Sequence, residues 1–268
     1  MATALSACAA LGLRAAYVGA VGTDDNGHRL RQELVGRGID LSHLVTREGT
    51  NQFAVITVDE CTGERIVLWD RDDRLMLRPA EVPAELIASA RLVHVDDVDE
   101  EAAIRAATLA REAGVPSTSD LDRITNRTAE LVAAVSIPIF AEHVLPAIIG
   151  EVDIERALFK LRLTHSGILC VTLGPRGSMM LIGDELCYEP GFAVVAVDTT
   201  GAGDVFRAGF IHAFLNGAAP HDILRFANAA AAISCTRPGA LNSVPTLAEV
   251  ARFLDDHPIA RSPNHQLI

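Results

Sequence analysis

The sequence predicts an α/β fold with one doubly wound, mainly parallel sheet flanked by helices. From residue 91 onward, short apolar segments alternate with helical segments of roughly ten to fifteen residues, which is the spacing of βαβ units. With 268 residues, 49% of them hydrophobic, the chain can fill one large core. Because no repeat or low-complexity linker divides it, we expect a single domain over residues 1–268.

Each strand is predicted from a short run of apolar or β-branched residues bounded by glycine, proline or polar residues. In chain order, the predicted strands cover residues 15–21, 52–58, 65–69, 92–95, 115–117, 137–140, 167–173, 178–182, 185–188 and 192–197. The second and third of these flank a turn that contains Gly63, which is typical of a β-hairpin. This hairpin, at about residues 50–70, is expected to leave the main sheet as a small β excursion.

Each helix is predicted from apolar residues spaced three or four apart, with start or stop signals at its ends. In chain order, the predicted helices cover residues 3–10, 29–35, 102–113, 128–135, 151–163, 202–215, 221–235 and 246–254. Gly12 follows the first helix as a stop signal, and Pro245 precedes the last helix.

The charge balance excludes some classes of partner. The chain has 35 acidic and 23 basic residues and a net charge of −12, so neither nucleic acid nor an anionic membrane is expected as a partner. Lys160 is the single lysine, so a bound anion must be held by arginines or by backbone N–H groups.

The cysteines and the apolar start of the chain bear on its compartment. The five cysteines are odd in number and form no CxxC pair, which favours a reducing compartment. The apolar start lacks the basic region of a signal peptide, and Arg14 interrupts it. We therefore expect a cytoplasmic protein.

The segment DTTGAGDVF, residues 198–206, carries the clearest chemistry. Gly201, Ala202 and Gly203 allow close approach of a ligand, and the unpaired N–H groups at the start of the following helix favour an anion. Asp204 beside them is suited to take a proton from a hydroxyl group that attacks phosphorus. A tight turn followed by a carboxylate at a helix start is the simpler alternative.

Two other phosphate-binding motifs do not fit the chain. No GxxxxGK[ST] segment exists, and Phe206 stands where a dinucleotide fingerprint needs glycine. A nucleotide-dependent oxidoreductase is therefore disfavoured.

Two segments in the right order resemble the signatures of the ribokinase-like (PfkB) carbohydrate kinases: VGAVGTDDNG at 18–27 and DTTGAGDVFRAGF at 198–210. The resemblance implies a ribokinase-like fold whose hairpin is a lid over the sugar. It also implies ATP-dependent phosphoryl transfer, with Mg²⁺, to a hydroxyl of a sugar or related polyol. Asp204 would be the catalytic base, and residues 201–203 would form the anion hole.

The same resemblance extends to the nucleotide and cation sites, through VTLGPRG at 171–177 and NAAAAISCTRPGA at 228–240. The residues implied to bind the nucleotide are Thr172, Gly174, Gly177, Asn228 and Gly239. Those in the position of the family's monovalent-cation site, with K⁺ as the expected ion, are Asp198, Thr200 and Ser243. Asp198 is equally well explained as a cap of the glycine loop.

The sugar is expected at the carboxyl ends of the parallel strands, where open α/β sheets bind ligands. Asp96 follows strand 92–95 and is a candidate for binding a sugar hydroxyl; Asp120 and Arg123 follow the next strand. Asn51, Gln52 and Arg65 are candidates on the lid, which in the family often makes a dimer contact as well.

The chain departs from the family pattern in two places. It begins about where the family's Gly-Gly turn ends, so roughly thirty residues, with a first strand and a sugar-binding Asp, are expected to be missing. The family's NxxE element, associated with Mg²⁺, is also absent near residues 140–150, where Glu142 is either its substitute or a solvated carboxylate. These departures leave a second reading open, a catalytically weak nucleotide-binding or regulatory protein that has lost part of its sugar site.

Overall fold

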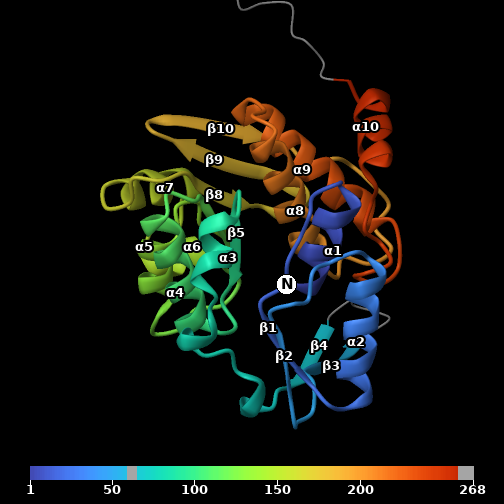
Figure 1. Cartoon of the computed structure of the whole chain (residues 1–268). Helices are drawn as coiled ribbons and strands as arrows, with labels where there is room; N and C mark the ends of the chain where they lie inside the picture. Colours follow the sequence, from blue (N-terminus) through green and yellow to red (C-terminus); the bar gives the residue numbers. More distant parts are fainter. Residues whose placement is uncertain (59–64, 259–268) are drawn as a thin grey trace, which may run out of the picture.

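The central sheet of the protein has the strand order β5–β6–β7–β8–β9–β10 (Figure 1). The computed structural model describes residues 1–58 and 65–258. The strands are β5 Val93–Asp96, β6 Ser117–Asp120, β7 Ile139–Ala141, β8 Leu169–Thr172, β9 Ser178–Ile182 and β10 Glu185–Glu189. Strands β5 to β8 are parallel to one another, and β6 and β7 are joined only by single bridges. Strand β9 is antiparallel to β8, and β10 is antiparallel to β9. The predicted mainly parallel sheet is confirmed.

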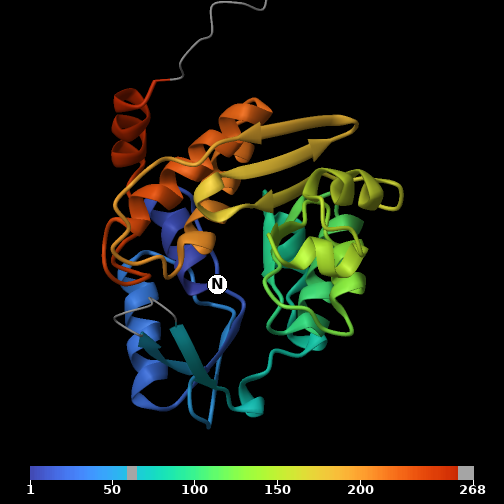
Figure 2. The same ribbon diagram turned by 180° about the vertical axis from the view of Figure 1, so that it is seen from behind.

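Helices cover both faces of this sheet (Figures 1 and 2). On one face lie α3 Ala84–Ser89, α4 Glu100–Glu112, α5 Thr128–Ala134, α6 Val144–Ile149 and α7 Ile154–Arg162; on the other lie α8 Ala202–Leu215 and α9 Pro220–Cys235, with α1 Ala2–Ala10 and α10 Leu247–Asp256 packed on them. Alternate residues of one strand serve the two layers: Leu169 and Val171 of β8 pack with α4 and α7, whereas Cys170 packs with α8 and α9. The doubly wound arrangement follows from this alternation.

A smaller unit precedes the sheet in sequence. It contains β1 Gly19–Gly22, α2 Asp25–Gly36, β2 Leu44–Arg47, β3 Phe53–Val58 and β4 Arg65–Asp70. Strands β1 and β2 are parallel, whereas β3 and β4 form the predicted antiparallel hairpin, whose turn lies outside the described residues. Two 3₁₀ turns follow β4, at η1 Asp73–Leu75 and η2 Pro79–Glu81. A third, η3 Gly174–Arg176, lies between β8 and β9 of the central sheet.

The strand predicted over residues 192–197 is wrong. This segment is irregular, and Val195 and Val197 are 86% and 63% exposed. The N–H groups of Val197 and Asp198 donate to the carbonyl of Cys235 at the end of α9 instead of to a strand. An apolar run predicts burial in a sheet, but here the chain crosses the surface to the start of α8, and its first residue, Phe192, packs against α10.

The other differences are short elements and shifted ends. The sequence did not predict β2, α3 or α6, and the strand predicted over 115–117 lies at Ser117–Asp120. Within the described residues, no helix combines the length and apolar character that a bilayer span needs.

Helix α8 packs closely against α9 at Gly209. A Cβ atom at Gly209 would lie 2.9 Å from the Cα of Ala227 and 3.3 Å from the Cβ of Ala230. The two helix backbones therefore approach closely, and this contact fixes the helix whose first turn carries Asp204.

We predict that Gly209→Ala lowers the free energy of unfolding by about 1–3 kcal/mol because the added methyl group must separate the two helices. Gly36→Ala is the matched control: it lies in α2 with open space around it, so it is expected to be neutral or to stabilise by up to about 1 kcal/mol. Urea unfolding of both variants measures the difference. Equal effects at the two positions would contradict the close approach.

Candidate active site

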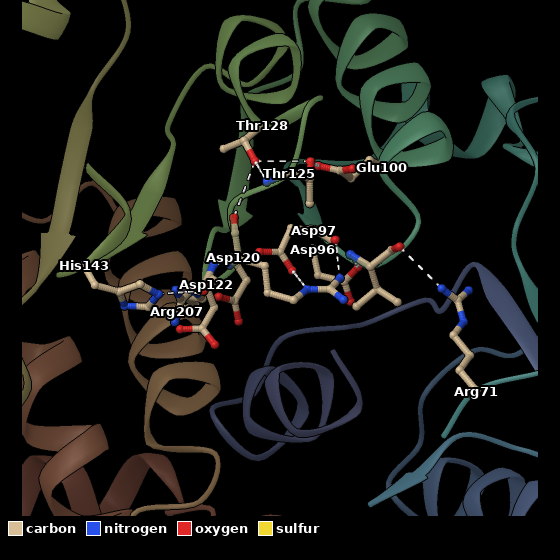
Figure 3. A network of polar contacts seen from close by, with 12 residues as sticks. Arg71, Asp96, Asp97, Glu100, Asp120, Asp122, Thr125, Thr128, His143 and Arg207 are labelled. Carbon is tan, nitrogen blue, oxygen red and sulfur yellow. Dashed lines mark hydrogen bonds and ion pairs between the residues drawn. The ribbon is translucent and has the colours of Figure 1, made fainter. Parts of the chain in front are cut away.

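Two carboxylates stand side by side where the parallel strands end. Asp96 and Asp120 are paired in the register of β5 and β6, and both end their strands (Figure 3). Burial raises the pKa of Asp96, although the N–H of Val98 donates to it. Burial also raises the pKa of Asp120, to about 6, against the opposing effect of the Arg207 guanidinium. The strand ends thus hold two acids of raised pKa, where ligands of α/β sheets bind.

Asp97 organises the loop that follows β6. Its buried carboxylate accepts hydrogen bonds from the backbone N–H groups of Asp122 at 2.8 Å and Arg123 at 2.6 Å. It also accepts from Nε of Arg123 at 3.1 Å. The loops after β5 and β6 are therefore tied together, which fixes the surroundings of Asp120.

We predict that Asp97→Asn lowers the free energy of unfolding by about 1–3 kcal/mol because the buried N–H groups lose a charged acceptor. Urea unfolding measures this loss. Asp122→Asn is the control in the same loop, since its residue is exposed, and no change is expected there. A loss of equal size in both variants would contradict the assigned role of Asp97.

The glycine segment forms the first turn of α8. Gly201 is the N-cap residue and has a left-handed backbone with φ +79°, and no side chain caps the helix. A Cβ at Gly201 would lie 3.0 Å from Cγ2 of Thr3 in α1 and 3.1 Å from Cβ of Ala240. Glycine is required by both the backbone conformation and the packing. The predicted anion hole, Gly201 to Gly203, thus lies at an uncapped helix N-terminus, which favours an anion.

Asp204 faces the strand ends from the same helical turn. Its side chain is 21% exposed, and its Oδ1 lies 3.1 Å from the ammonium nitrogen of Met1. Burial lowers the pKa of this ammonium, but the nearby carboxylates of Asp204 and Asp96, and more weakly Asp120, raise it overall. All three carboxylates therefore act on one space between α8, β5 and β6.

Asp198 joins the glycine loop to the loop after α9. Its Oδ1 accepts from the N–H of Thr200 and its Oδ2 from the N–H of Gly239, both at 2.9 Å. Ser243 is buried, and its hydroxyl donates to the carbonyl of Ala240 at 3.1 Å. The structure thus brings Asp198, Thr200 and Ser243 into two adjoining loops and gives Asp198 the loop-capping role.

The residues predicted to bind nucleotide border the ends of β8 to β10. Thr172 Oγ1 donates to the carbonyl of Phe140 at 3.3 Å. Gly174 and Gly177 have positive φ angles, and a Cβ at Gly177 would lie 2.1 Å from the carbonyl oxygen of Glu189. These glycines let the loop after β8 turn against the strand end.

Asn228 of α9 is bound inside the fold. Its Oδ1 accepts from Oγ of Ser178 at 3.0 Å, and its Nδ2 donates to the carbonyls of Glu189 and Pro190 at 3.1 and 3.2 Å. These bonds join α9 to β9 and to the end of β10. Contact between Asn228 and a nucleotide stays a prediction, as do the other nucleotide contacts.

Two of the lid candidates, Asn51 and Gln52, precede β3, and the third, Arg65, lies in the second strand of the hairpin. Asn51 Oδ1 accepts from the N–H of Gly22 at 3.3 Å, and Gln52 is exposed. Arg65 begins β4, and its side chain lies outside the described part of the chain. The guanidinium of Arg123 lies 6.0 Å from the ring centroid of Trp69, which links the hairpin to the loop after β6.

Glu142 follows β7 and forms an ion pair with Arg176 in the loop after β8. Both side chains are exposed, at 46% and 60%. Among the described residues there is no group of three or more His, Cys, Asp or Glu that could hold a metal ion. A role for Glu142 with Mg²⁺ therefore stays a prediction.

Sequence reasoning missed Arg207 and the role of Asp97 in joining the two loops. Arg207 is only 3% exposed and forms an ion pair with Asp120. A charged residue inside the apolar segment VFRAGF, residues 205–210, was the available signal. Asp97 gave no comparable signal because it stands in an acidic run after β5.

An uncapped glycine turn beside an aspartate, opposite carboxylates at strand ends, offers the groups that phosphoryl transfer needs: an anion site, a base and hydroxyl acceptors. The model of the pfkB family carbohydrate kinases matches residues 2–247. The chain therefore belongs to the pfkB family of carbohydrate kinases. The predicted function, ATP-dependent phosphoryl transfer to a sugar, is confirmed at the level of this family, and the alternative of a regulatory protein is not favoured.

Individual kinases of known name are also similar to the chain. The chain is 33% identical to the ATP-dependent ribose-1-phosphate kinase of Halopiger xanaduensis over 94% of this chain and 84% of that protein. It is 30% identical to the ribokinase of Haemophilus influenzae over 93% of this chain and 84% of that protein. The structure of Arabidopsis thaliana ribokinase with ribose and ATP is similar, with a TM-score of 0.84 and 26% identity over 94% of this chain and 86% of that one. The predicted ribokinase-like fold is confirmed.

Proposed function

We propose that the protein transfers the terminal phosphoryl group of ATP to a hydroxyl group of a sugar or related polyol, with Asp204 as the catalytic base. The observation that carries the proposal is the position of Asp204. It lies in the first turn of α8, next to Gly203, and on the side that faces Asp96 and Asp120. One residue thus adjoins both an anion site and a set of hydroxyl acceptors.

The residues present fit a phosphoryl group. The left-handed Gly201 and the uncapped first turn of α8 direct N–H groups toward an anion without a side chain in the way. Arg207 packs against Gly203 and adds positive charge beneath the turn. When bound, Mg²⁺ would neutralise charge on the ATP phosphates. It usually keeps several waters and takes one or two carboxylates, and Glu142, which follows β7, is the carboxylate proposed to hold it on this chain.

The acceptor hydroxyl is activated by the chain's own groups. Asp204 accepts the proton as the hydroxyl oxygen attacks phosphorus, and the amide of Gly203 holds an equatorial oxygen of the transferring group, whereas the N–H of Ala202 donates to the carbonyl of Thr199. Asp96 and Asp120 accept hydrogen bonds from other hydroxyl groups of the sugar and so orient it. Asn51, Gln52 and Arg65 contact the sugar from the hairpin, which excludes water when it closes.

The exposed hairpin residues bear on the predicted homodimer, and the free thiols bear on the predicted location. Phe53, Leu68 and Trp69 are exposed on the hairpin, which supports a homodimer contact through the lid. The free cysteines Cys8, Cys170, Cys187 and Cys235 support a cytoplasmic location, since reducing compartments keep thiols free.

A panel of sugars and nucleosides with ATP and Mg²⁺, followed by a coupled assay of ADP release, tests the function. We expect sugar-dependent turnover, and we expect Asp204→Asn to lower kcat by about 10²–10⁴-fold because no base receives the proton. The control is Asp184→Asn in the exposed turn between β9 and β10, which should retain full activity. Full turnover by the Asp204 variant would remove that residue from the mechanism.

The proposed monovalent-cation site predicts that turnover depends on K⁺. Asp198, Thr200 and Ser243 lie in the two loops that Asp198 joins, and backbone carbonyls there would complete a site for K⁺. Replacing KCl by choline chloride at equal ionic strength should therefore lower kcat while leaving the melting temperature within a few degrees. Identical kcat values in the two salts would argue against the site.

A further inference from the structure

Arg207 is a buried cation one helical turn beyond the proposed base. It lies on α8, and its side chain is 4% exposed. Its Nη2 is 2.6 Å from Oδ1 of Asp120, at the end of β6 (Figure 3). The ion pair thus joins the helix that begins the anion site to the strand that ends at the sugar side.

The same guanidinium lies against the anion hole. A Cβ at Gly203 would be only 2.7 Å from Nη1 of Arg207. Any side chain at position 203 would therefore displace the guanidinium. Within the described residues, Nε of Arg207 is buried and has no hydrogen-bond partner. A buried charge held with one nitrogen unpaired carries a desolvation cost that packing alone does not explain.

The ion pair with Arg207 leaves the side chain of Asp120 partly accessible. Arg207 contacts Oδ1, and 21% of the Asp120 side chain remains exposed. Burial raises the pKa of Asp120, and the nearby carboxylates of Asp204 and Asp97 raise it further. The Arg207 guanidinium and the Met1 ammonium lower it, and the net result is a pKa of about 6. Arg207 therefore favours the ionised carboxylate, which is the stronger acceptor of a hydroxyl hydrogen bond.

We propose that Arg207 is a positioning residue for the acceptor sugar: it fixes Asp120 through Oδ1 so that Oδ2 accepts a sugar hydroxyl, and it supports the backbone of Gly203 from beneath. This inference rests on the proposed function. Because Asp96, Asp120 and Asp204 surround the same space, the part of the substrate bound there carries neutral hydroxyl groups, and a carboxylate or phosphate at that end of the sugar is repelled.

The variants Arg207→Met, Arg207→Lys and Asp120→Asn separate this role from a structural one. Sugar binding is measured by calorimetry with a non-hydrolysable ATP analogue present, between pH 5 and pH 8. The sugars are ribose and fructose. Steady-state KM and kcat and urea unfolding are measured on the same preparations. Arg156→Met is the matched control, since Arg156 is exposed on α7.

The wild type should bind sugar more weakly as the pH falls through the region where Asp120 is protonated. In Arg207→Met we expect this acid limb to move to higher pH, because the cation that favours ionisation is lost, and KM at neutral pH to rise about tenfold or more. The change in kcat should be smaller than the change in KM. Arg207→Lys should recover much of the affinity, and Asp120→Asn should remove the part of the acid limb that Asp120 contributes while weakening binding.

A folded Arg207→Met variant with wild-type KM and an unchanged pH profile would overturn the proposal. If that variant does not fold, Asp120→Asn decides, and unchanged sugar affinity in this isosteric variant overturns it equally. Sugar binding without turnover by the wild type would reject phosphoryl transfer and leave the role of Arg207 standing. Failure of the wild type to bind either sugar would overturn the proposed role of Arg207, whereas phosphoryl transfer is decided separately by turnover with the full panel.

Discussion

The site depends on the packing of one buried helix, α8, against the sheet, against α9 beside it and against α1. Its first turn must be free of side-chain caps and point at the strand ends, and both conditions come from packing. Gly201 lies against Thr3 of α1, and Gly209 lets the backbone approach Ala227 of α9. Phe206 and Phe210 fill the layer between α8 and the sheet. Because interiors are close-packed, this packing leaves Asp204 little freedom to move away from β5 and β6.

The side chains around the proposed site are mainly acidic, although the site is proposed to bind a phosphate group. Three carboxylates, Asp96, Asp120 and Asp204, share one space in a chain of net charge −12. In the proposed mechanism backbone amides supply the anion site, so the phosphate side needs few cationic side chains. Arg207 is the buried exception, and it stands between the two halves, against Gly203 on one side and paired with Asp120 on the other. One guanidinium thus joins the proposed phosphate side to the proposed sugar side.

The sequence reveals those parts of the molecule that are encoded locally. The turn and helix start at residues 198–206 were predictable because a glycine pair, a carboxylate and an apolar helix follow one another in the chain. The strand predicted over 192–197 failed because apolar character does not specify a hydrogen-bond partner, and the carbonyl of Cys235 took that place. The Arg207–Asp120 pair could not be predicted, since its two residues meet only when α8 packs on β6.

A crystal structure of the chain with a sugar that it phosphorylates and a non-hydrolysable ATP analogue tests the central claim most directly. The account predicts the acceptor hydroxyl within about 2.6–3.2 Å of an Asp204 carboxylate oxygen, with the terminal phosphate at the first turn of α8. A sugar bound elsewhere, or a phosphate directed away from residues 201–203, would contradict it.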